Sequence, residues 1–188
     1  MRRTSLLFTA ILLVLAVVAC APGAAGTAEP TTTAGFDHYV QGVNLFNQKQ
    51  FQQAVDELSQ AITANPQNSR AFYARGNAYG MLGLPDKAIA DFKQAVTLDP
   101  KDDISYFALA IAYANQGQRR EAIAALDKAI ALANQADYYG LRGTLYAEQN
   151  DPQHAIPDLG KALSLGLDAQ QAQKVQSLLQ QMRGQPAP

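Results

Sequence analysis

Apolar residues recur at helical spacing along most of the chain. Four times, an alanine is followed four residues later by leucine or phenylalanine, and a second alanine follows three residues after that. The four sets are Ala54, Leu58 and Ala61; Ala88, Phe92 and Ala95; Ala122, Leu126 and Ala129; and Ala155, Leu159 and Ala162. Residues four and three positions apart share one face of an α-helix, so each set predicts a helix with one buried face.

A small residue precedes each set and indicates an internal repeat. These residues are Gly42, Gly76, Ala110 and Gly143, which are separated by 34, 34 and 33 positions. Pro85 and Pro152 stand where a second helix of the unit should begin, and the missing amide hydrogen of proline costs nothing there. Asp151 is placed to cap such a helix. The chain is therefore predicted to consist of repeated helix pairs.

This pattern resembles that of the tetratricopeptide repeat (TPR) family. The match is fullest over residues 69–102, through Phe72, Gly76, Tyr79, Ala88, Phe92, Ala95 and Pro100. The resemblance implies an all-α TPR solenoid of four helix-turn-helix repeats, at residues 35–68, 69–102, 103–135 and 136–167. Two units depart from the pattern. Asn134 replaces the expected proline of the third unit, and Pro157 and Gly160 fall inside the second helix of the fourth, where proline can kink a helix.

Residues 168–183 predict one further helix. Its apolar residues, Val175, Leu178, Leu179 and Met182, form one stripe on an otherwise glutamine-rich helix. A helix of this kind covers the exposed end of a solenoid, so we expect it to be a C-terminal capping helix. Residues 184–188 are predicted to be a disordered tail.

The N-terminal residues have a different character. After Arg2 and Arg3 comes an apolar run that ends at Cys20, which predicts a signal peptide over residues 1–19. The letters LAVVAC resemble the lipobox of bacterial lipoproteins, and the resemblance implies lipidation of Cys20. An uncleaved membrane anchor is the alternative, because residues 5–21 approach the length that spans a bilayer. Residues 20–34, rich in proline, glycine and threonine, predict a flexible linker.

Charge and residue chemistry narrow the function. The chain has 15 basic and 16 acidic residues, and cleavage before Cys20 would remove two of the basic ones, which leaves no electrostatic footprint for nucleic acid. His38 and His154 belong to the first and last units, too far apart to share a metal. The sequence contains no cluster with metal-ligand spacing and no phosphate-binding glycine loop between a strand and a helix. We therefore expect no enzymatic activity, no metal and no cofactor.

A second regularity pairs residues that are 16 positions apart. The pairs are Gln41 with Glu57, Arg75 with Asp91, Leu109 with Ala125, and Arg142 with Asp158. Arginine meets aspartate, glutamine meets glutamate, and leucine meets alanine. We expect each pair to join the two helices of one unit, so that both arginine–aspartate pairs are structural ion pairs.

The TPR resemblance also implies a groove lined by the first helix of each unit. The second, fifth, ninth and twelfth residues of a unit share one helical face. The candidate groove residues are Tyr39, Val43, Arg70, Tyr73, Asn77, Gly80, Phe107 and Ile111. Tyr39, Tyr73 and Phe107 occupy equivalent positions and would form an aromatic ladder along the groove, or would instead pack into the core. Gly80 leaves a gap in this stripe, which we expect to be a pocket for an apolar side chain of a partner.

The groove predicts what kind of partner would bind. Members of the family that bind acidic chaperone tails do so through lysine, asparagine and arginine at several groove positions. In this chain only Arg70 and Asn77 have suitable side chains at those positions. The groove is instead suited to an extended or helical segment with apolar anchors.

These features together predict a noncatalytic adaptor or scaffold tethered to the bacterial envelope. The chain is similar to TPR lipoproteins that recruit cell-wall enzymes or help to assemble pili and secretion channels. Its partners would be envelope proteins and, through the lipid anchor, the membrane. Because Ala21 follows the cysteine, the resemblance implies sorting to the outer membrane, facing the periplasm, in a bacterium with two membranes. In a species with one membrane it implies the outer face of the plasma membrane. The alternatives are a self-associating structural lipoprotein and a binder of a small apolar ligand or glycan.

The lipobox resemblance can be tested by replacing Cys20 with serine. Because the hydroxyl cannot take the place of the acylated thiol, Cys20→Ser should block acylation and leave an unprocessed precursor. Electrophoretic mobility and metabolic labelling with a fatty acid report both effects. Processing and membrane association equal to those of the wild type would refute lipidation.

Overall fold

The computed structural model describes residues 30–184, with side chains from residue 33 onward. The expected signal peptide over residues 1–19, Cys20 and tail residues 185–188 lie outside the described residues. The described part holds nine α-helices and no strand, which confirms the all-α prediction. The helices are α1 Pro30–Asn47, α2 Phe51–Ala64, α3 Ser69–Met81, α4 Pro85–Leu98, α5 Asp103–Asn115, α6 Arg119–Leu132, α7 Ala136–Glu148, α8 Pro152–Leu165 and α9 Ala169–Arg183. None of them is both long and apolar enough to cross a membrane.

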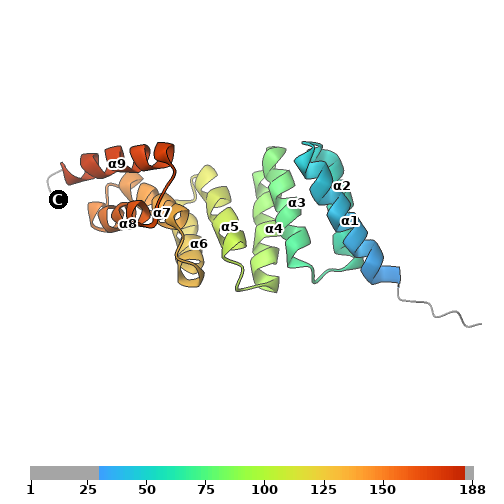
Figure 1. Cartoon of the computed structure of the whole chain (residues 1–188). Helices are drawn as coiled ribbons and strands as arrows, with labels where there is room; N and C mark the ends of the chain where they lie inside the picture. The colour runs from blue at the N-terminus through green and yellow to red at the C-terminus, as the bar shows by residue number, and fades with distance from the viewer. Residues whose placement is uncertain (1–29, 185–188) are drawn as a thin grey trace, which may run out of the picture. The chain divides into compact units, whose positions relative to one another are not determined.

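The helices pack in chain order as antiparallel pairs (Figure 1). Helices α3 and α4, α5 and α6, and α7 and α8 form the pairs with the most extensive contacts, and α1 contacts α2 in the same way. Successive pairs touch through α2 and α3, α4 and α5, and α6 and α7. Each pair therefore contacts only its neighbours, as in a solenoid.

Small residues let the two helices of a pair approach closely. A Cβ atom built on the glycine of three pairs would lie under 3.0 Å from a side chain of the partner helix. The three contacts are Gly42 with Leu58 Cγ at 2.6 Å, Gly76 with Phe92 Cε1 at 2.7 Å, and Gly143 with Leu159 Cγ at 2.9 Å. In the third pair Ala110 takes this place and is fully buried, as is Leu126. The triplets identified from the sequence are thus the core of each helix pair.

The turn inside each pair uses a left-handed residue at the same position. These residues are Lys49 (φ 61°), Gly83 (φ 71°), Gly117 (φ 73°) and Asn150 (φ 54°). Glycine adopts this conformation freely, whereas a residue with a Cβ atom is strained there. The two inner turns carry glycine, and the outer turns carry lysine and asparagine. Gly83, just past the end of α3, therefore fits the left-handed position that commonly terminates a helix.

The first helix begins earlier than the sequence predicted. Residues 30–34, which belong to the predicted flexible linker, form the start of α1. Proline is preorganised for the first position of a helix, so Pro30 can start α1 even though its surroundings have the composition of a linker. In the fourth pair, α8 starts at Pro152 and continues through Pro157. Asp151 caps its start, because the Asp151 side chain accepts a hydrogen bond from the His154 amide.

Helix α9 packs on the last pair, as expected for a cap. It contacts both α7 and α8, and its residues Val175, Leu179 and Met182 are buried. They join a cluster that includes Ala155 and Leu159 of α8. Asp168 and Gln171 form a capping box that fixes the start of the helix.

The turn geometry predicts that Lys49→Gly stabilises the protein. A non-glycine residue in the left-handed region costs about 1 kcal/mol or slightly more, so glycine should raise the free energy of unfolding by about 1 kcal/mol. Urea unfolding of the full-length chain in detergent measures the change.

The neighbouring substitution Gln48→Gly is the control for Lys49→Gly. Gln48 has a negative φ, so glycine there relieves no strain and should not stabilise the protein. An equal gain from both substitutions would contradict this account of the turn.

Candidate functional site

A hollow of about 710 Å³ lies between α3 and α5 and is bounded on a third side by the start of α4. Five candidate groove residues line it together: Tyr73, Asn77, Gly80, Phe107 and Ile111. We call this hollow the central cavity. Five of the groove residues predicted from the sequence thus lie around one cavity in the structure.

No charged side chain is found among the residues that line the central cavity. Its polar groups are side-chain amides and one phenol, contributed by Asn77, Asn115, Gln116 and Tyr73. The rest of its surface is mainly apolar. An apolar wall with a few amides can hold an uncharged side chain and still bond to a peptide backbone.

The aromatic residues form the wall of the cavity and also pack against the core. Tyr73 meets the ring of Phe92 with 6.0 Å between centroids, and Phe107 meets Tyr138 at 4.7 Å. Both Tyr73 and Phe107 are half-buried. The ladder expected from the sequence is therefore not freely exposed, because one face of each ring supports the helix packing.

The three glycines of residues 76–83 have three different environments. Gly76 lies against Phe92, and Gly83 has the left-handed backbone described above. A Cβ atom built on Gly80 would meet nothing within 4 Å. Gly80 is exposed and lines the central cavity, so its lack of a side chain leaves space open.

Large apolar side chains at the cavity rim are unusually exposed. Met81 is 60% exposed, Ile104 is 54% exposed and Ile111 is 39% exposed. All three line the central cavity. A cluster of exposed apolar side chains beside a cavity marks an interaction site more reliably than isolated ones do. Met81 is not among the candidate groove residues predicted from the sequence, because it lies at the end of α3, outside the four positions counted per unit.

Two smaller hollows continue the central cavity in both directions. The first, of about 430 Å³, includes Tyr39, Arg70 and Lys101 and shares Tyr73 and Ile104 with the central cavity. The second, of about 370 Å³, includes Gly140, Thr144 and Lys174 and shares Phe107 and Ile111 with it. We name them the Arg70 hollow and the Lys174 hollow, and the three hollows together are the groove. Val43 is half-buried on α1 and lines none of the three.

The structure pairs the arginines and aspartates that the sequence pairs. Arg75 donates two hydrogen bonds of 2.8 Å to Asp91, and Arg142 donates bonds of 2.7 and 2.8 Å to Asp158. The hydrogen bonds to these carboxylates raise the pKa of both arginines, so both stay charged at any physiological pH. In each pair the aspartate is buried.

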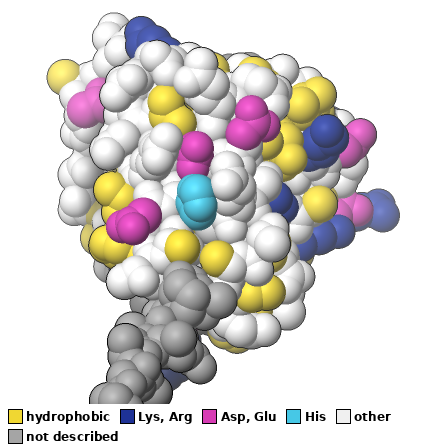
Figure 2. All heavy atoms as spheres, turned by 90° about the vertical axis from the view of Figure 1, so that its right-hand side faces the viewer, with side chains coloured by type: hydrophobic (Ala, Val, Ile, Leu, Met, Phe, Trp, Pro, Cys, Tyr) yellow, Lys and Arg dark blue, Asp and Glu magenta, His cyan; other side chains and the backbone are white. Residues whose placement is uncertain are grey.

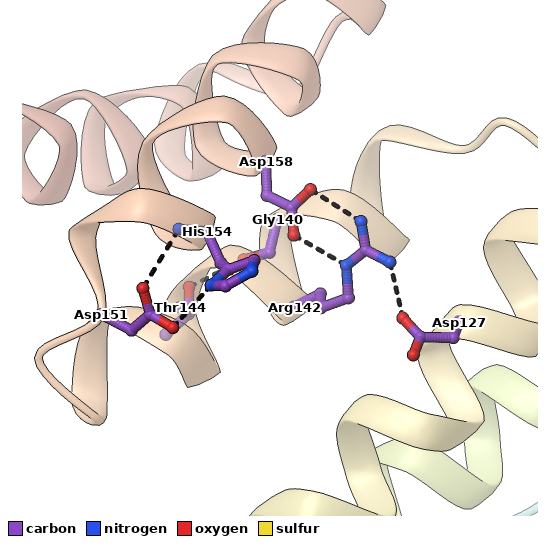
Figure 3. A network of polar contacts seen from close by, with 7 residues as sticks. All are labelled: Asp127, Gly140, Arg142, Thr144, Asp151, His154 and Asp158. Carbon is purple, nitrogen blue, oxygen red and sulfur yellow. Dashed lines mark hydrogen bonds and ion pairs between the residues drawn. The ribbon is translucent and has the colours of Figure 1, made fainter.

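Each arginine also reaches the preceding helix pair, which the sequence did not predict. Arg75 donates to Ser59 Oγ on α2 at 3.0 Å, and Arg142 donates to Asp127 on α6 at 2.6 Å. Figure 3 shows Arg142 between Asp127 and Asp158, on two different helices. Each arginine therefore connects three helices.

The first and third pairs use other chemistry at this position. In the first, Gln41 donates to Glu57 at 3.3 Å, and His38 Nδ1 lies 2.6 Å from the same carboxylate. His38 is one helical turn before Gln41, so helical periodicity was the signal that could have revealed it. In the third, Leu109 and Ala125 are both buried in the apolar core.

The other histidine belongs to the cap of α8. His154 Nδ1 lies 2.6 Å from Asp151 Oδ2, and its ring stacks on Tyr146 (Figure 3 shows the contact with Asp151). The hydrogen bond with His154 lowers the pKa of Asp151. Among the described residues, no group of three or more His, Cys, Asp or Glu side chains could hold a metal ion.

Sequence comparison identifies the family. Models described as tetratricopeptide repeat match residues 69–102, 92–124 and 136–165, and a model described as TPR repeat matches residues 42–83. The chain belongs to the tetratricopeptide repeat family. No curated protein matches it.

Solved TPR structures share the fold. The chain is similar to YrrB, described as a TPR protein with an unusual peptide-binding site, with 24% identity, a TM-score of 0.68, and coverage of 77% of this chain and 75% of YrrB. It is similar to MamA with 25% identity, a TM-score of 0.69, and coverage of 80% and 86%. The first TPR domain of Spaghetti (RPAP3), solved with an HSP90 peptide, gives 19% identity, a TM-score of 0.61, and coverage of 62% and 94%.

The ion pair between Arg75 and Asp91 should be strongly coupled. Each single substitution, Arg75→Leu or Asp91→Ala, leaves a charge without its buried partner and should cost about 3 kcal/mol. The double variant recreates the leucine and alanine of the third unit, so it should cost clearly less than the sum of the two. Urea unfolding measures this double-mutant cycle.

A second cycle on Arg119 and Glu148 provides the control. These residues form a 2.9 Å ion pair, but both side chains are about half exposed, at 47% and 48%. Its coupling energy should stay below about 1 kcal/mol. Absence of coupling between Arg75 and Asp91 would mean that the pair does not stabilise the fold.

Proposed function

We propose that this protein is a noncatalytic adaptor that binds a segment of a partner protein in the groove. The observation that carries the proposal is the central cavity, which is uncharged, mainly apolar and open at Gly80. Two similar structures support it through what their descriptions state: YrrB has a peptide-binding site, and the Spaghetti domain binds an HSP90 peptide. The TPR fold itself is used by many proteins as a binding scaffold.

The adaptor role assigns no catalytic group. Arg75, Asp91, Arg142 and Asp158 are engaged with one another between helices, where a substrate would have to displace an ion pair. They act in this proposal as structural residues. The groove residues are amides, aromatics and aliphatic side chains, which bind rather than react.

The continuity of the groove favours a peptide over a small ligand or glycan. Such a ligand would be best held by a pocket closed at both ends. Here the central cavity shares Tyr73 and Ile104 with the hollow on one side and Phe107 and Ile111 with the hollow on the other. A channel of this kind accommodates an extended segment that crosses several helices.

Helix α1 disfavours end-to-end stacking of two copies. One face of α1 carries Asp37, Val40 and Asn44, where the equivalent positions of α3 hold Ala71, Ala74 and Ala78. Ala74 and Ala78 pack in a cluster with residues of α2, and Ala71 is fully buried. Burying Asp37 and Asn44 in the same way would cost free energy unless both found partners. Figure 2 shows this end of the molecule, where charged side chains of both signs lie among apolar ones.

We further propose that the adaptor is tethered to the bacterial envelope. The support is the sequence alone: the lipobox resemblance at Cys20 and the linker that follows it. A linker that ends at Pro30 would keep the groove near the membrane and raise its effective concentration toward other membrane-bound proteins. By analogy with sorting rules the location would be the outer membrane, facing the periplasm. Recruitment of cell-wall enzymes and assembly of pili or secretion channels are the roles that fit this location.

Gly80→Leu is the test of the adaptor role. Leucine has space at this position and is a better helix former than glycine, so the melting temperature should stay equal or rise. The side chain would fill the central cavity, so partner capture should be lost. Circular dichroism and crosslinked pull-down from native membranes measure the two effects.

Two other glycines provide matched controls. Gly160→Leu on α8 also enters open space but lies outside the groove, so capture should be retained. Gly76→Leu collides with Phe92 and should unfold the protein at lower temperature by overpacking. If Gly80→Leu captures the same partners as the wild type, the groove is not the binding site.

A further inference from the structure

The described part of the chain contains two methionines in opposite environments. Met81, the last residue of α3, is 60% exposed and lines the central cavity one residue after Gly80. Met182 on α9 is 2% exposed and belongs to the core cluster with Val175 and Leu179. The same side chain thus faces the groove in one place and is enclosed by the core in the other.

Met81 also differs in reactivity from the other residues of the central cavity. The chain contains no tryptophan, and its one cysteine, Cys20, lies outside the described residues. The other residues that line the cavity are glycine, proline, aliphatic or aromatic residues, and residues with side-chain amides. A mild two-electron oxidant such as hydrogen peroxide reacts with a thioether in preference to these groups. Exposure and reactivity therefore coincide at one atom, Met81 Sδ.

Oxidation of this sulfur consumes a peroxide and releases water. A lone pair of Met81 Sδ attacks one oxygen of hydrogen peroxide, the O–O bond breaks, and an S–O bond forms. The sulfur loses two electrons, and the peroxide that gains them leaves as water after proton transfer. The product is methionine sulfoxide, which is uncharged but polar. A sulfoxide reductase reverses the step with a dithiol, which becomes a disulfide while the oxygen leaves as water.

A sulfoxide at this position would change the wall of the cavity. The reduced Met81 side chain is flexible and apolar, so it can adapt to an apolar side chain that enters beside Gly80. After oxidation the same contact would bury an S–O group against an apolar surface, and a polar group buried without a hydrogen bond opposes binding. The Gln116 amide of the lining is already engaged, since it donates to Asp86 and accepts from Gln118, both at 2.7 Å.

We infer that Met81 is a reversible oxidation site that controls binding in the groove. The thioether admits a segment with an apolar anchor, and the sulfoxide rejects it. The inference rests on the proposed function, because the segment binds in the same groove. It adds the chemical class of a regulator, a peroxide, and the atom on which that regulator acts.

The first measurement is the selectivity of oxidation. Full-length protein in peroxide-free detergent is treated with graded hydrogen peroxide and digested with trypsin, which places Met81 in peptide 76–87 and Met182 in peptide 175–183. The exposed fractions, 60% against 2%, differ about thirtyfold, so mass spectrometry should show Met81 converted to sulfoxide about tenfold faster or more. Equal rates at the two methionines in the folded protein would overturn the inference.

The second measurement is the effect of the sulfoxide on the groove. The probe is a fluorescein-labelled peptide with Leu-Phe-Leu at its centre and serines on both sides, and fluorescence anisotropy gives its Kd. Oxidation of Met81 should weaken binding by about tenfold, as expected when one polar group is buried without a partner. Treatment with sulfoxide reductase should restore the original Kd. Circular dichroism should show unchanged melting of the oxidised protein, because Met81 is exposed.

Three substitutions separate the Met81 sulfur from other targets of peroxide. Met81→Leu has no thioether, so peroxide should not change the Kd of this variant, whatever that Kd is. Met182→Leu is a volume-conserving change in the core, and this variant should respond to peroxide as the wild type does. Met81→Gln introduces a polar group of similar length and should weaken the peptide by about tenfold without peroxide.

The results separate this inference from the proposed function. Selective oxidation of Met81 with an unchanged Kd would overturn the inference, and loss of the same peptide in Gly80→Leu would leave the groove as a peptide site. A peroxide response retained in Met81→Leu would overturn it as well, because another residue would then be responsible. Failure of the peptide to bind the reduced protein would overturn the groove and the inference together. Selective, reversible loss of binding that is absent from Met81→Leu supports the inference.

Discussion

The close approach of two helices at a small residue is the contact on which the rest of this molecule depends. Where Gly42, Gly76 and Gly143 face a leucine or phenylalanine, a single added carbon would collide with the partner helix. This contact fixes the spacing of each helix pair. Because the same contact recurs every 33 or 34 residues, the pairs are alike and stack in order. The turns and the buried ion pairs then act on helices that are already placed.

The groove is a consequence of that repetition. Alike pairs place the first helix of each unit at equivalent positions, so residues with the same number within a unit follow one another along one surface. The groove surface thus follows from the repeat itself, and its specificity comes from the residues that individual units place in it. Such residues are Gly80, Asn77 and the exposed apolar side chains of Met81, Ile104 and Ile111.

Most features that depend on one helix or one helix pair could be predicted from the sequence, whereas contacts that connect three helices could not. The repeat, the role of Gly76 and the contacts of Arg75 and Arg142 follow from spacing within a unit. The start of α1 at Pro30 was missed because proline and threonine are equally typical of a linker. The bonds from the two arginines to the preceding pair depend on how successive pairs meet. That geometry has no local signal in the sequence.

The arginine contacts are present at two of the junctions between helix pairs and absent from the third. Arg75 ties the second pair to the first through Ser59, and Arg142 ties the fourth to the third through Asp127. The junction of the second and third pairs has no arginine of this kind. Its apolar contacts are accompanied by a bond of 2.7 Å from Gln116 to Asp86. This junction also borders the central cavity. Beside the central cavity the stack is therefore held together by apolar packing rather than by a buried charge.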